Sequence, residues 1–169
     1  MSKLIILTRG APGAGKTTFL ENMGLTSYVV SPDEIRAKQG GVFLDTQGHE
    51  QRGPIDEREV WLEVETTIRK LMEQKSLIVV DATFQSTRDF KMPLKLANLF
   101  KYTVVCIDFS DVSLVELHHR NSKRTGWRLV PPEVIDTAYE RIRVNKIPES
   151  VTVMKPDQYA RSKFAARFR

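Results

Sequence analysis

The chain has 169 residues, 41% hydrophobic and 28% charged, which is typical of one ordinary globular domain. No apolar run approaches the roughly 18 residues that a membrane helix needs, and no signal peptide is visible. The single cysteine, Cys106, excludes a disulfide framework and lies in an apolar run, as a core residue does. We therefore expect a single domain over residues 1–169, located in the cytoplasm and without membrane contact.

Charge is spread unevenly along the chain, although the 26 Lys and Arg against 21 Asp and Glu give a net charge of only +5. Acids predominate between residues 44 and 65, whereas the segment 118–128 has four bases and no acid. The tail, residues 155–169, is basic as well. Basic segments suit partners rich in phosphate, although for the tail an ordinary solvated surface is an equal explanation.

The first element along the chain leads into a glycine-rich loop. Leu4–Leu7 is a short apolar run that predicts a buried parallel strand. Residues 10–17 follow it and fit the pattern G-x-x-x-x-G-K-[ST]. Residues 18–23 can continue as a helix that Gly24 ends. A strand before the loop and a helix after it are the context that a phosphate-binding loop requires.

The residue types in this loop define its predicted chemistry. Gly10, Gly13 and Gly15 allow a tight turn that points backbone N–H groups at a phosphate. Lys16 can reach the β- and γ-phosphates, and the hydroxyl of Thr17 can hold Mg²⁺. The predicted nucleotide-binding residues of the loop are Gly10, Ala11, Pro12, Gly13, Ala14, Gly15, Lys16, Thr17 and Thr18.

The next segments alternate between strand and helix signals. Residues 27–30 predict a second strand, and Ser31 with Pro32 predicts the capped start of a helix that ends at Gly40-Gly41. Residues 42–53 show no clear period and are expected to form a loop. Pro54 is expected to open a helix. The buried stripe of that helix is predicted from helical spacing at Trp61, Val64, Ile68 and Leu71.

The second half of the chain continues the alternation. Strands are expected at 77–80, 103–108 and 151–154. Helices are expected from Ser86 or Thr87 to about 100 with a possible kink at Pro93, from 114 to about 120, from Pro131-Pro132 onward, and in the tail from 156. In the helix after Pro132, one face carries Val134, Ala138 and Ile142. The pattern predicts an α/β fold with a four- or five-stranded parallel sheet and helices on both faces.

An acidic and a basic residue follow the second predicted strand. Asp33 and Arg36 are three residues apart, so they share one face of a helix. Ligands of an open parallel sheet bind at the carboxyl ends of its strands, where this pair lies. There Asp33 can accept a proton from an attacking hydroxyl, and Arg36 can hold a phosphate of the acceptor. The alternative is a surface ion pair of little consequence.

Two further aspartates end predicted strands. Asp81 follows the apolar run 77–80, as a Walker-B acid does, and can orient the Mg²⁺ shell or bond the loop hydroxyl. The alternative is an aspartate that caps a helix or shapes a turn. Asp108 is a weaker candidate, and we expect it to have a turn or structural role.

The basic segment supplies two candidate lid residues, Arg120 and Arg124. They are four residues apart and would point the same way on a helix. Arginines that close over a nucleotide neutralise the charge that develops on the transferred phosphoryl group. A solvated helix end with favourable dipole interactions is the alternative. The three histidines (His49, His118 and His119) show no zinc-ligand spacing.

Taken together, these residues resemble the 5′-polynucleotide kinases of phage and bacterial nucleic-acid repair, over roughly residues 4–143. The resemblance is carried by GAPGAGKT, by Asp33-Glu34-Ile35-Arg36 as the family's D-x-x-R, by Asp81-Ala82-Thr83, and by residues 120–124 followed by Pro131 as the lid. The tetrapeptide 81–84 departs from the family's D-[AT]-[TN]-N form at Phe84.

The resemblance implies a P-loop kinase fold with a basic lid over about 118–130. It also implies transfer of the γ-phosphate of ATP, or of another NTP such as GTP, to the 5′-hydroxyl of RNA or DNA. It assigns the NTP phosphates and Mg²⁺ to Lys16 and Thr17, the general base to Asp33, and the acceptor phosphate to Arg36. Asp81 would support the phosphate site, acting on Mg²⁺ through water. Arg120 and Arg124 would be the lid arginines.

Two other hypotheses and one question of extent stay open at this stage. The chain resembles only the kinase part of proteins that also carry phosphatase or ligase modules, so it is either a kinase-only protein or one part of a longer chain. A small-molecule P-loop kinase acting on an antibiotic, sugar or nucleotide-sugar hydroxyl is the main alternative. A non-catalytic NTP-gated binding module is the third, against which the joint presence of Lys16, Thr17, Asp33 and Asp81 argues.

Overall fold

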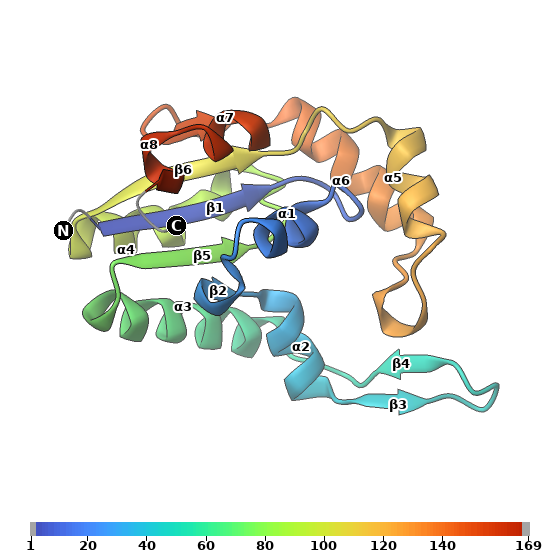
Figure 1. Cartoon of the computed structure of the whole chain (residues 1–169). Helices are drawn as coiled ribbons and strands as arrows, with labels where there is room; N and C mark the ends of the chain where they lie inside the picture. The colour runs from blue at the N-terminus through green and yellow to red at the C-terminus, as the bar shows by residue number, and fades with distance from the viewer. Residues whose placement is uncertain (1–2, 167–169) are drawn as a thin grey trace.

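The computed structural model describes residues 3–166 and is built on one parallel sheet (Figure 1). The sheet has five strands in the order β2-β5-β1-β6-β7. These strands are β1 (Lys3–Arg9), β2 (Val29–Val30), β5 (Leu77–Asp81), β6 (Tyr102–Asp108) and β7 (Thr152–Met154). All four neighbouring pairs are parallel, which confirms the α/β fold predicted from the alternating pattern.

Alternate residues of the central strand β1 enter two separate cores. Leu4 and Ile6 pack on the face that carries α1 (Lys16–Asn22) and α6 (Pro132–Val144). Ile5 and Leu7 pack on the opposite face, against α3 (Glu57–Gln74) and α4 (Lys91–Phe100). Successive side chains of a strand point to opposite faces, so an uninterrupted apolar run is what a strand covered on both sides requires.

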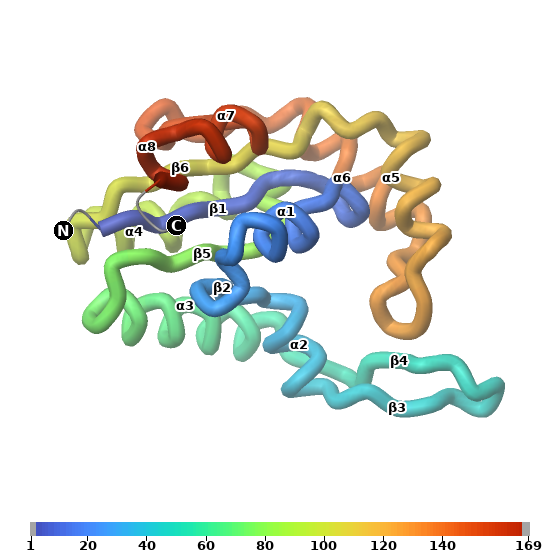
Figure 2. The backbone as a smooth tube through the Cα atoms, in the orientation of Figure 1, coloured from blue at the N-terminus to red at the C-terminus, as the bar shows by residue number. Residues whose placement is uncertain are grey.

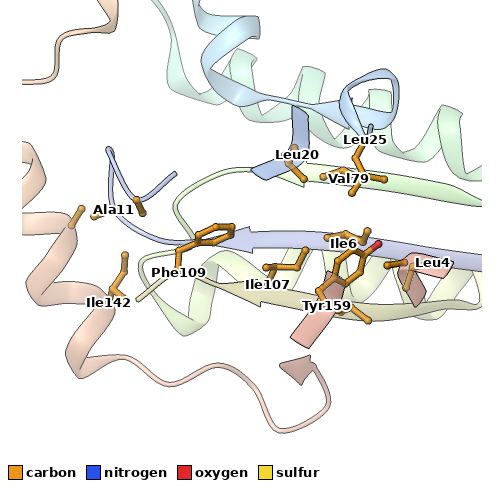
Figure 3. Packing of buried hydrophobic residues seen from close by; sticks show 14 of the residues in the cluster. Leu4, Ile6, Ala11, Leu20, Leu25, Val79, Ile107, Phe109, Ile142 and Tyr159 are labelled. Atoms are coloured by element: carbon orange, nitrogen blue, oxygen red, sulfur yellow. The ribbon is translucent and has the colours of Figure 1, made fainter. Parts of the chain in front are cut away.

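The first of these cores also receives the C-terminal helices. The side chain of Tyr159, from α7 (Pro156–Ala160), is buried there (Figure 3). The side chain of Ala165, from α8 (Lys163–Ala166), is buried in the same core. Lys155, at the start of α7, donates hydrogen bonds to Asp108 (2.9 Å) and Asp111 (2.6 Å). The tail is therefore helical and packed as far as residue 166. The last three residues of the basic tail, 167–169, lie outside the described part of the chain.

The segment 42–53, expected as a loop, forms an antiparallel hairpin that projects beyond α2 (Pro32–Gly40) in Figure 2. Its strands are β3 (Val42–Leu44) and β4 (Glu50–Arg52). The side chain of Asp45 closes the turn by accepting hydrogen bonds from the N–H groups of Gln47 and His49, both at 2.9 Å. No alternation of apolar and polar residues marks these strands in the sequence, because five of their six residues are exposed.

The neck of the hairpin depends on two glycines. A Cβ at Gly53 would collide with the carbonyl oxygen of Gly40, and a Cβ at Gly40 would lie 2.7 Å from the carbonyl oxygen of Gly53. The N–H of Gly53 donates to the carbonyl of Gly41 at 3.2 Å. Glycine is therefore needed at both positions, where the two backbone segments pass close to each other at the base of the hairpin.

Helix boundaries agree with the predictions in most places and differ in a few. Ser31 caps α2, Ser113 caps α5 (Leu114–Asn121), and Ser86 caps a 3-10 turn, η2 (Thr87–Phe90), that leads into α4. The second strand is shorter than predicted, because residues 26–28 form a 3-10 turn, η1 (Thr26–Tyr28). Pro54 does not open α3, since the helix begins at Glu57 with Asp56 as its N-cap.

Two buried-stripe predictions are wrong at single residues. Trp61 is 38% exposed, and the stripe of α3 consists of Val60, Val64, Ile68 and Met72. Val134 of α6 is likewise exposed, and Ile135 takes its place beside Ala138 and Ile142. The predicted stripe of α3 is one residue out of phase at both ends, because Met72 is buried while Leu71 is only half-buried. The predicted stripe of α6 is out of phase at one end. Val60 and Ile135 fit the i, i+4, i+7 or i+8 spacing of the observed faces.

Candidate active site

The phosphate-binding loop turns from β1 into α1 at the carboxyl end of the sheet (Figure 1). Gly13 and Gly15 have φ angles of 89° and 95°, which side-chain-bearing residues rarely adopt. A Cβ at Gly10 would lie 2.9 Å from the Cβ of Phe109, so that position is closed by packing. Within the described chain no side chain caps α1, and the N–H groups of its first turn face the loop.

The other loop residues serve the same turn. Ala11 and Ala14 are buried, and Pro12 lies half-buried between them. The N–H of Ala14 donates to the carbonyl of Ala11 at 3.1 Å, which closes the turn. Thr17 and Thr18 lie exposed on the first turn of α1.

The ammonium group of Lys16 folds back into the loop and donates to the carbonyl oxygens of Gly10 (2.8 Å) and Ala11 (3.2 Å). Burial lowers the pKa of Lys16, while the charges of Asp81 and Asp33 raise it in part. The two carboxylates therefore act on the same lysine, although they come from different elements of the sheet edge. A partly desolvated ammonium at this point is suited to bind an anionic phosphate.

Asp81 connects β1, α1 and β5. One carboxylate oxygen accepts a hydrogen bond from Thr8 (2.7 Å) and the other accepts one from Thr17 (3.1 Å). The predicted Walker-B position and the loop hydroxyl are thus neighbours. Among residues 3–166 no group of three or more His, Cys, Asp or Glu side chains gathers as a metal site. One hydroxyl beside one carboxylate fits Mg²⁺, which keeps several waters and takes other ligands from substrate phosphates.

Asp33 and Arg36 share a face of α2, as predicted, and form an ion pair at 2.8 Å. Arg36 also makes a bidentate contact to Glu57 of α3, with N–O distances of 2.8 and 2.9 Å. The hydrogen bond to Glu57 raises the pKa of Arg36, and the same bond lowers the pKa of Glu57. Glu57 was not predicted as a site residue. The sequence places Glu57 at the start of a predicted helix, but the periodicity of that helix does not show that it packs beside α2.

The two predicted lid arginines differ in their contacts, and a hydrogen bond to the phosphate loop is found for Arg120. Arg120, on the last turn of α5, donates to the carbonyls of Ala14 (3.3 Å) and Gly13 (3.4 Å) and is held by Glu116 at 2.6 Å. The helix α5 ends at Asn121, close to the predicted end at about residue 120, so Arg124 lies beyond the helix and does not share a helical face with Arg120. Burial lowers the pKa of Arg124, whereas the charge of Asp33 raises it, so this guanidinium lies near the predicted base.

A pocket of about 420 Å³ lies beside the phosphate loop at the same edge. It brings together three predicted site residues, Asp33, Arg36 and Asp81. Sequence reasoning missed most of its other lining residues, which are Pro32, Trp61, Ala82, Thr83, Phe84, Gln85, Ser86, Asp89, Arg141 and Asn145. Trp61 belongs to this pocket because it lies exposed at the start of α3. Phe84 adopts φ 45° and is buried against Phe90.

Arg9 was also missed, although it ends the strand that leads into the loop. It is 5% exposed and donates to the carbonyls of Ile142 and Asn145, both at 2.7 Å, and to that of Phe84 at 3.3 Å. It also pairs with Asp108 at 3.4 Å. Arg9 therefore ties β1 to the end of α6 and to one wall of the pocket. An arginine that closes an apolar strand was the available signal, because a buried guanidinium requires several acceptors.

A parallel sheet of this order, with a phosphate-binding loop after β1 and a carboxylate at the end of β5, is the fold of a P-loop kinase. The chain belongs to the AAA_33 family, described as an AAA domain, which it matches over residues 5–145. No protein of curated function matches it in sequence.

Solved structures with this fold act in different settings. A chain in the Pnkp1/Rnl/Hen1 RNA repair complex is 24% identical, with a TM-score of 0.67, over 84% of this chain and 44% of that one. A gluconokinase from Sinorhizobium meliloti 1021 is 16% identical, with a TM-score of 0.52, over 92% and 83% of the two chains. A putative kinase from Chloroflexus aurantiacus j-10-fl is 14% identical, with a TM-score of 0.56, over 98% and 92%. At these identities the likeness shows the fold alone, and this chain spans less than half the length of the first of the three.

No helix among residues 3–166 is long and apolar enough to cross a membrane.

Proposed function

We propose that the chain transfers the γ-phosphate of ATP, or of another NTP, to the 5′-hydroxyl of a nucleic acid. The observation that carries the proposal is the pocket beside the phosphate loop. Its lining includes two carboxylates, Asp33 and Asp81, and two arginines, Arg36 and Arg141. A carboxylate at a phosphate loop suits a hydroxyl acceptor, and two guanidinium groups beside it suit an acceptor that carries a phosphate of its own.

The proposed step is an in-line displacement. Asp33 takes the proton of the 5′-hydroxyl as its oxygen attacks the γ-phosphorus. The bond from that phosphorus to the bridging oxygen breaks, and the NDP leaves with the electron pair. Lys16, Arg120 and Arg124 supply positive charge around the transferred group, and the N–H groups of the loop hold the β-phosphate.

Mg²⁺, when held by Thr17 and through water by Asp81, would neutralise charge on the phosphate oxygens. Asp81 is already positioned for this by its bond to Thr8. In the arrangement described here Arg36 orients Asp33 directly. Contact with an acceptor phosphate then falls to Arg141, or to Arg36 once it releases Glu57 or Asp33.

A sugar or other small-molecule kinase is the second candidate. It is supported by coverage, because the gluconokinase and the putative kinase match this chain over most of their own lengths. A pocket of about 420 Å³ also has the size of a small-molecule site. The two candidates share the NTP site and Asp33 and differ only in the acceptor.

The test is transfer of labelled γ-phosphate from ATP and from GTP, with Mg²⁺, to 5′-hydroxyl RNA and DNA oligonucleotides. A panel of sugars and nucleosides runs in parallel. We expect transfer to an oligonucleotide and a loss of about 10²–10⁴-fold in the Asp33→Asn variant. Binding of NTP to that variant, measured by calorimetry, should remain close to that of the unchanged protein.

The matched control is Glu73→Gln, which makes the same carboxylate-to-amide change at an exposed position near the end of α3. That variant should transfer phosphate at the normal rate. Near-normal transfer by Asp33→Asn would overturn the general-base assignment. Transfer to a sugar but to no oligonucleotide would overturn the polynucleotide proposal in favour of the second candidate.

A further inference from the structure

A second cavity lies between the β3–β4 hairpin and the lid, which approach each other in Figure 2. This groove measures about 1290 Å³ and is open to solvent. One wall is residues 48–52 of the hairpin, and the other includes His118, Trp127 and Leu129. The strand β4 packs directly on the 3-10 turn η3 (Gly126–Arg128) of the lid. Gly126 adopts a φ angle of 59°, which side-chain-bearing residues rarely adopt, and it lies against the side chain of Glu50.

The groove contains an aromatic ring that already stacks with planar cations. The guanidinium carbon of Arg52 lies 4.4 Å from the centroid of the Trp127 ring, and that of Arg128 lies 5.0 Å from it. Tryptophan faces that accept a guanidinium also accept a nucleobase, and base stacking on aromatic side chains is how proteins hold single strands.

Arg52 connects this groove to the pocket at the phosphate loop. Its Nη1 lies 3.8 Å from Oδ1 of Asp33, the proposed general base. Its Nε is buried and finds no hydrogen-bond acceptor within residues 3–166. A buried guanidinium N–H without a partner is costly, and an anionic ligand beside it would supply one. Asp33 lines the pocket and Arg52 lines the groove, so the two cavities meet at this ion pair.

The charges around the groove favour a polyanion only moderately. Arg52 lines the groove and Arg128 lies against the Trp127 ring, while Glu50 also lines the groove and His118 is bonded to Asp136 at 2.7 Å. Stacking on Trp127, rather than net charge, is therefore the main interaction that the groove offers.

We propose that the groove between hairpin and lid binds the nucleotides that follow the reacting 5′ end of a single-stranded acceptor. Trp127 stacks a base, and Arg52 contacts the phosphate that links the first nucleotide to those behind it. The inference rests on the proposed function and adds that the hairpin, absent from the sequence-based expectation, selects a polynucleotide over a mononucleotide.

The experiment compares acceptors of increasing length with Trp127→Ala and Trp127→Phe variants of the whole chain. The acceptors are a nucleoside 3′-monophosphate, and 5′-hydroxyl oligonucleotides of two, five and ten residues. Stacking of one base is worth about 1–3 kcal/mol, so Trp127→Ala should lower kcat/KM for the longer acceptors about tenfold or more. It should leave the mononucleotide within about twofold, and Trp127→Phe should recover most of the loss.

Two further measurements separate this inference from others. Arg52→Lys keeps the charge but loses the planar guanidinium. Because the nucleoside 3′-monophosphate already carries the phosphate that Arg52 contacts, this variant should lower kcat/KM for every acceptor, the mononucleotide included, unlike Trp127→Ala. Arg69→Lys, at a half-buried ion pair on α3, is the control for that change. Thermal unfolding of each variant checks that the lid substitutions leave the core folded.

The outcomes are distinguishable. If the unchanged protein phosphorylates oligonucleotides but Trp127→Ala lowers kcat/KM equally for every length, or not at all, the groove is not the strand site. A rise in the KM for ATP without a length effect would assign the groove to the NTP base and overturn the inference. If the unchanged protein phosphorylates no nucleic acid, the proposed function itself fails.

Discussion

The two sides of the candidate active site are built differently. The phosphate loop, Asp81 and Arg9 are fixed by strands whose side chains are almost completely buried, and each polar group there has two or more partners. The hairpin and the lid stand outside the core, with Val42, Phe43, Leu44 and Leu129 all exposed. We infer that the buried sheet edge binds the NTP, which is common to many kinases, and that the exposed hairpin and lid determine which acceptor binds.

The largest effect is expected on the buried side. Replacing Lys16 by Met removes the charge that the loop holds against its own carbonyls, so transfer should fall about 10²–10³-fold for every acceptor. This is measured as kcat/KM with an oligonucleotide and, where active, a small acceptor. Lys38→Met, on an exposed turn of α2, is the matched control. A loss confined to one acceptor class would contradict a shared NTP site.

Stability should divide along the same line. Ile68 is 0% exposed in the core under the sheet, whereas Leu44 is 67% exposed on β3. Ile68→Ala should lower the free energy of unfolding by about 2–5 kcal/mol, and Leu44→Ala should change it by less than about 0.5 kcal/mol. Urea unfolding monitored by circular dichroism gives both values. Comparable losses would mean that the hairpin belongs to the cooperative core.

This division also explains what the sequence could predict. The strands, the phosphate loop, the helix starts at Ser31 and Ser113 and the strand end at Asp81 can be recognised from short stretches of sequence. Burial on both faces and helix capping each require particular residue types within a few positions. The hairpin has no buried face and so left no periodic pattern. Contacts such as Arg36 with Glu57 or Arg52 with Trp127 join residues 21 or more positions apart, and only the folded chain brings them together.

A smaller effect concerns acid stability, and it compares two aspartates, one on each side. Burial raises the pKa of Asp108, but hydrogen bonds from Lys155 and Ser110, with the charges of Lys155 and Arg9, outweigh it and hold the pKa below its ordinary value. Hydrogen bonds from the N–H groups of His49 and Gln47 similarly lower the pKa of Asp45 in the hairpin turn. Only the first of these carboxylates is connected to the core.

A carboxyl whose pKa is lower in the folded protein than in the unfolded chain stabilises the fold above its unfolded pKa, about 4. That stabilisation is lost as the pH falls through the folded value. Asp108→Asn should therefore lower the free energy of unfolding by about 1–3 kcal/mol at pH 7. This difference in unfolding free energy from the unchanged protein should become smaller below about pH 4. Asp45→Asn should leave the pH dependence of global unfolding unchanged, because the hairpin adds no buried core. Unfolding followed from pH 7 to pH 3 compares the two variants. If the difference in unfolding free energy from the unchanged protein narrowed equally for both variants, the exposed hairpin would be coupled to the sheet. The physical basis for separating the nucleotide side from the acceptor side would then be lost.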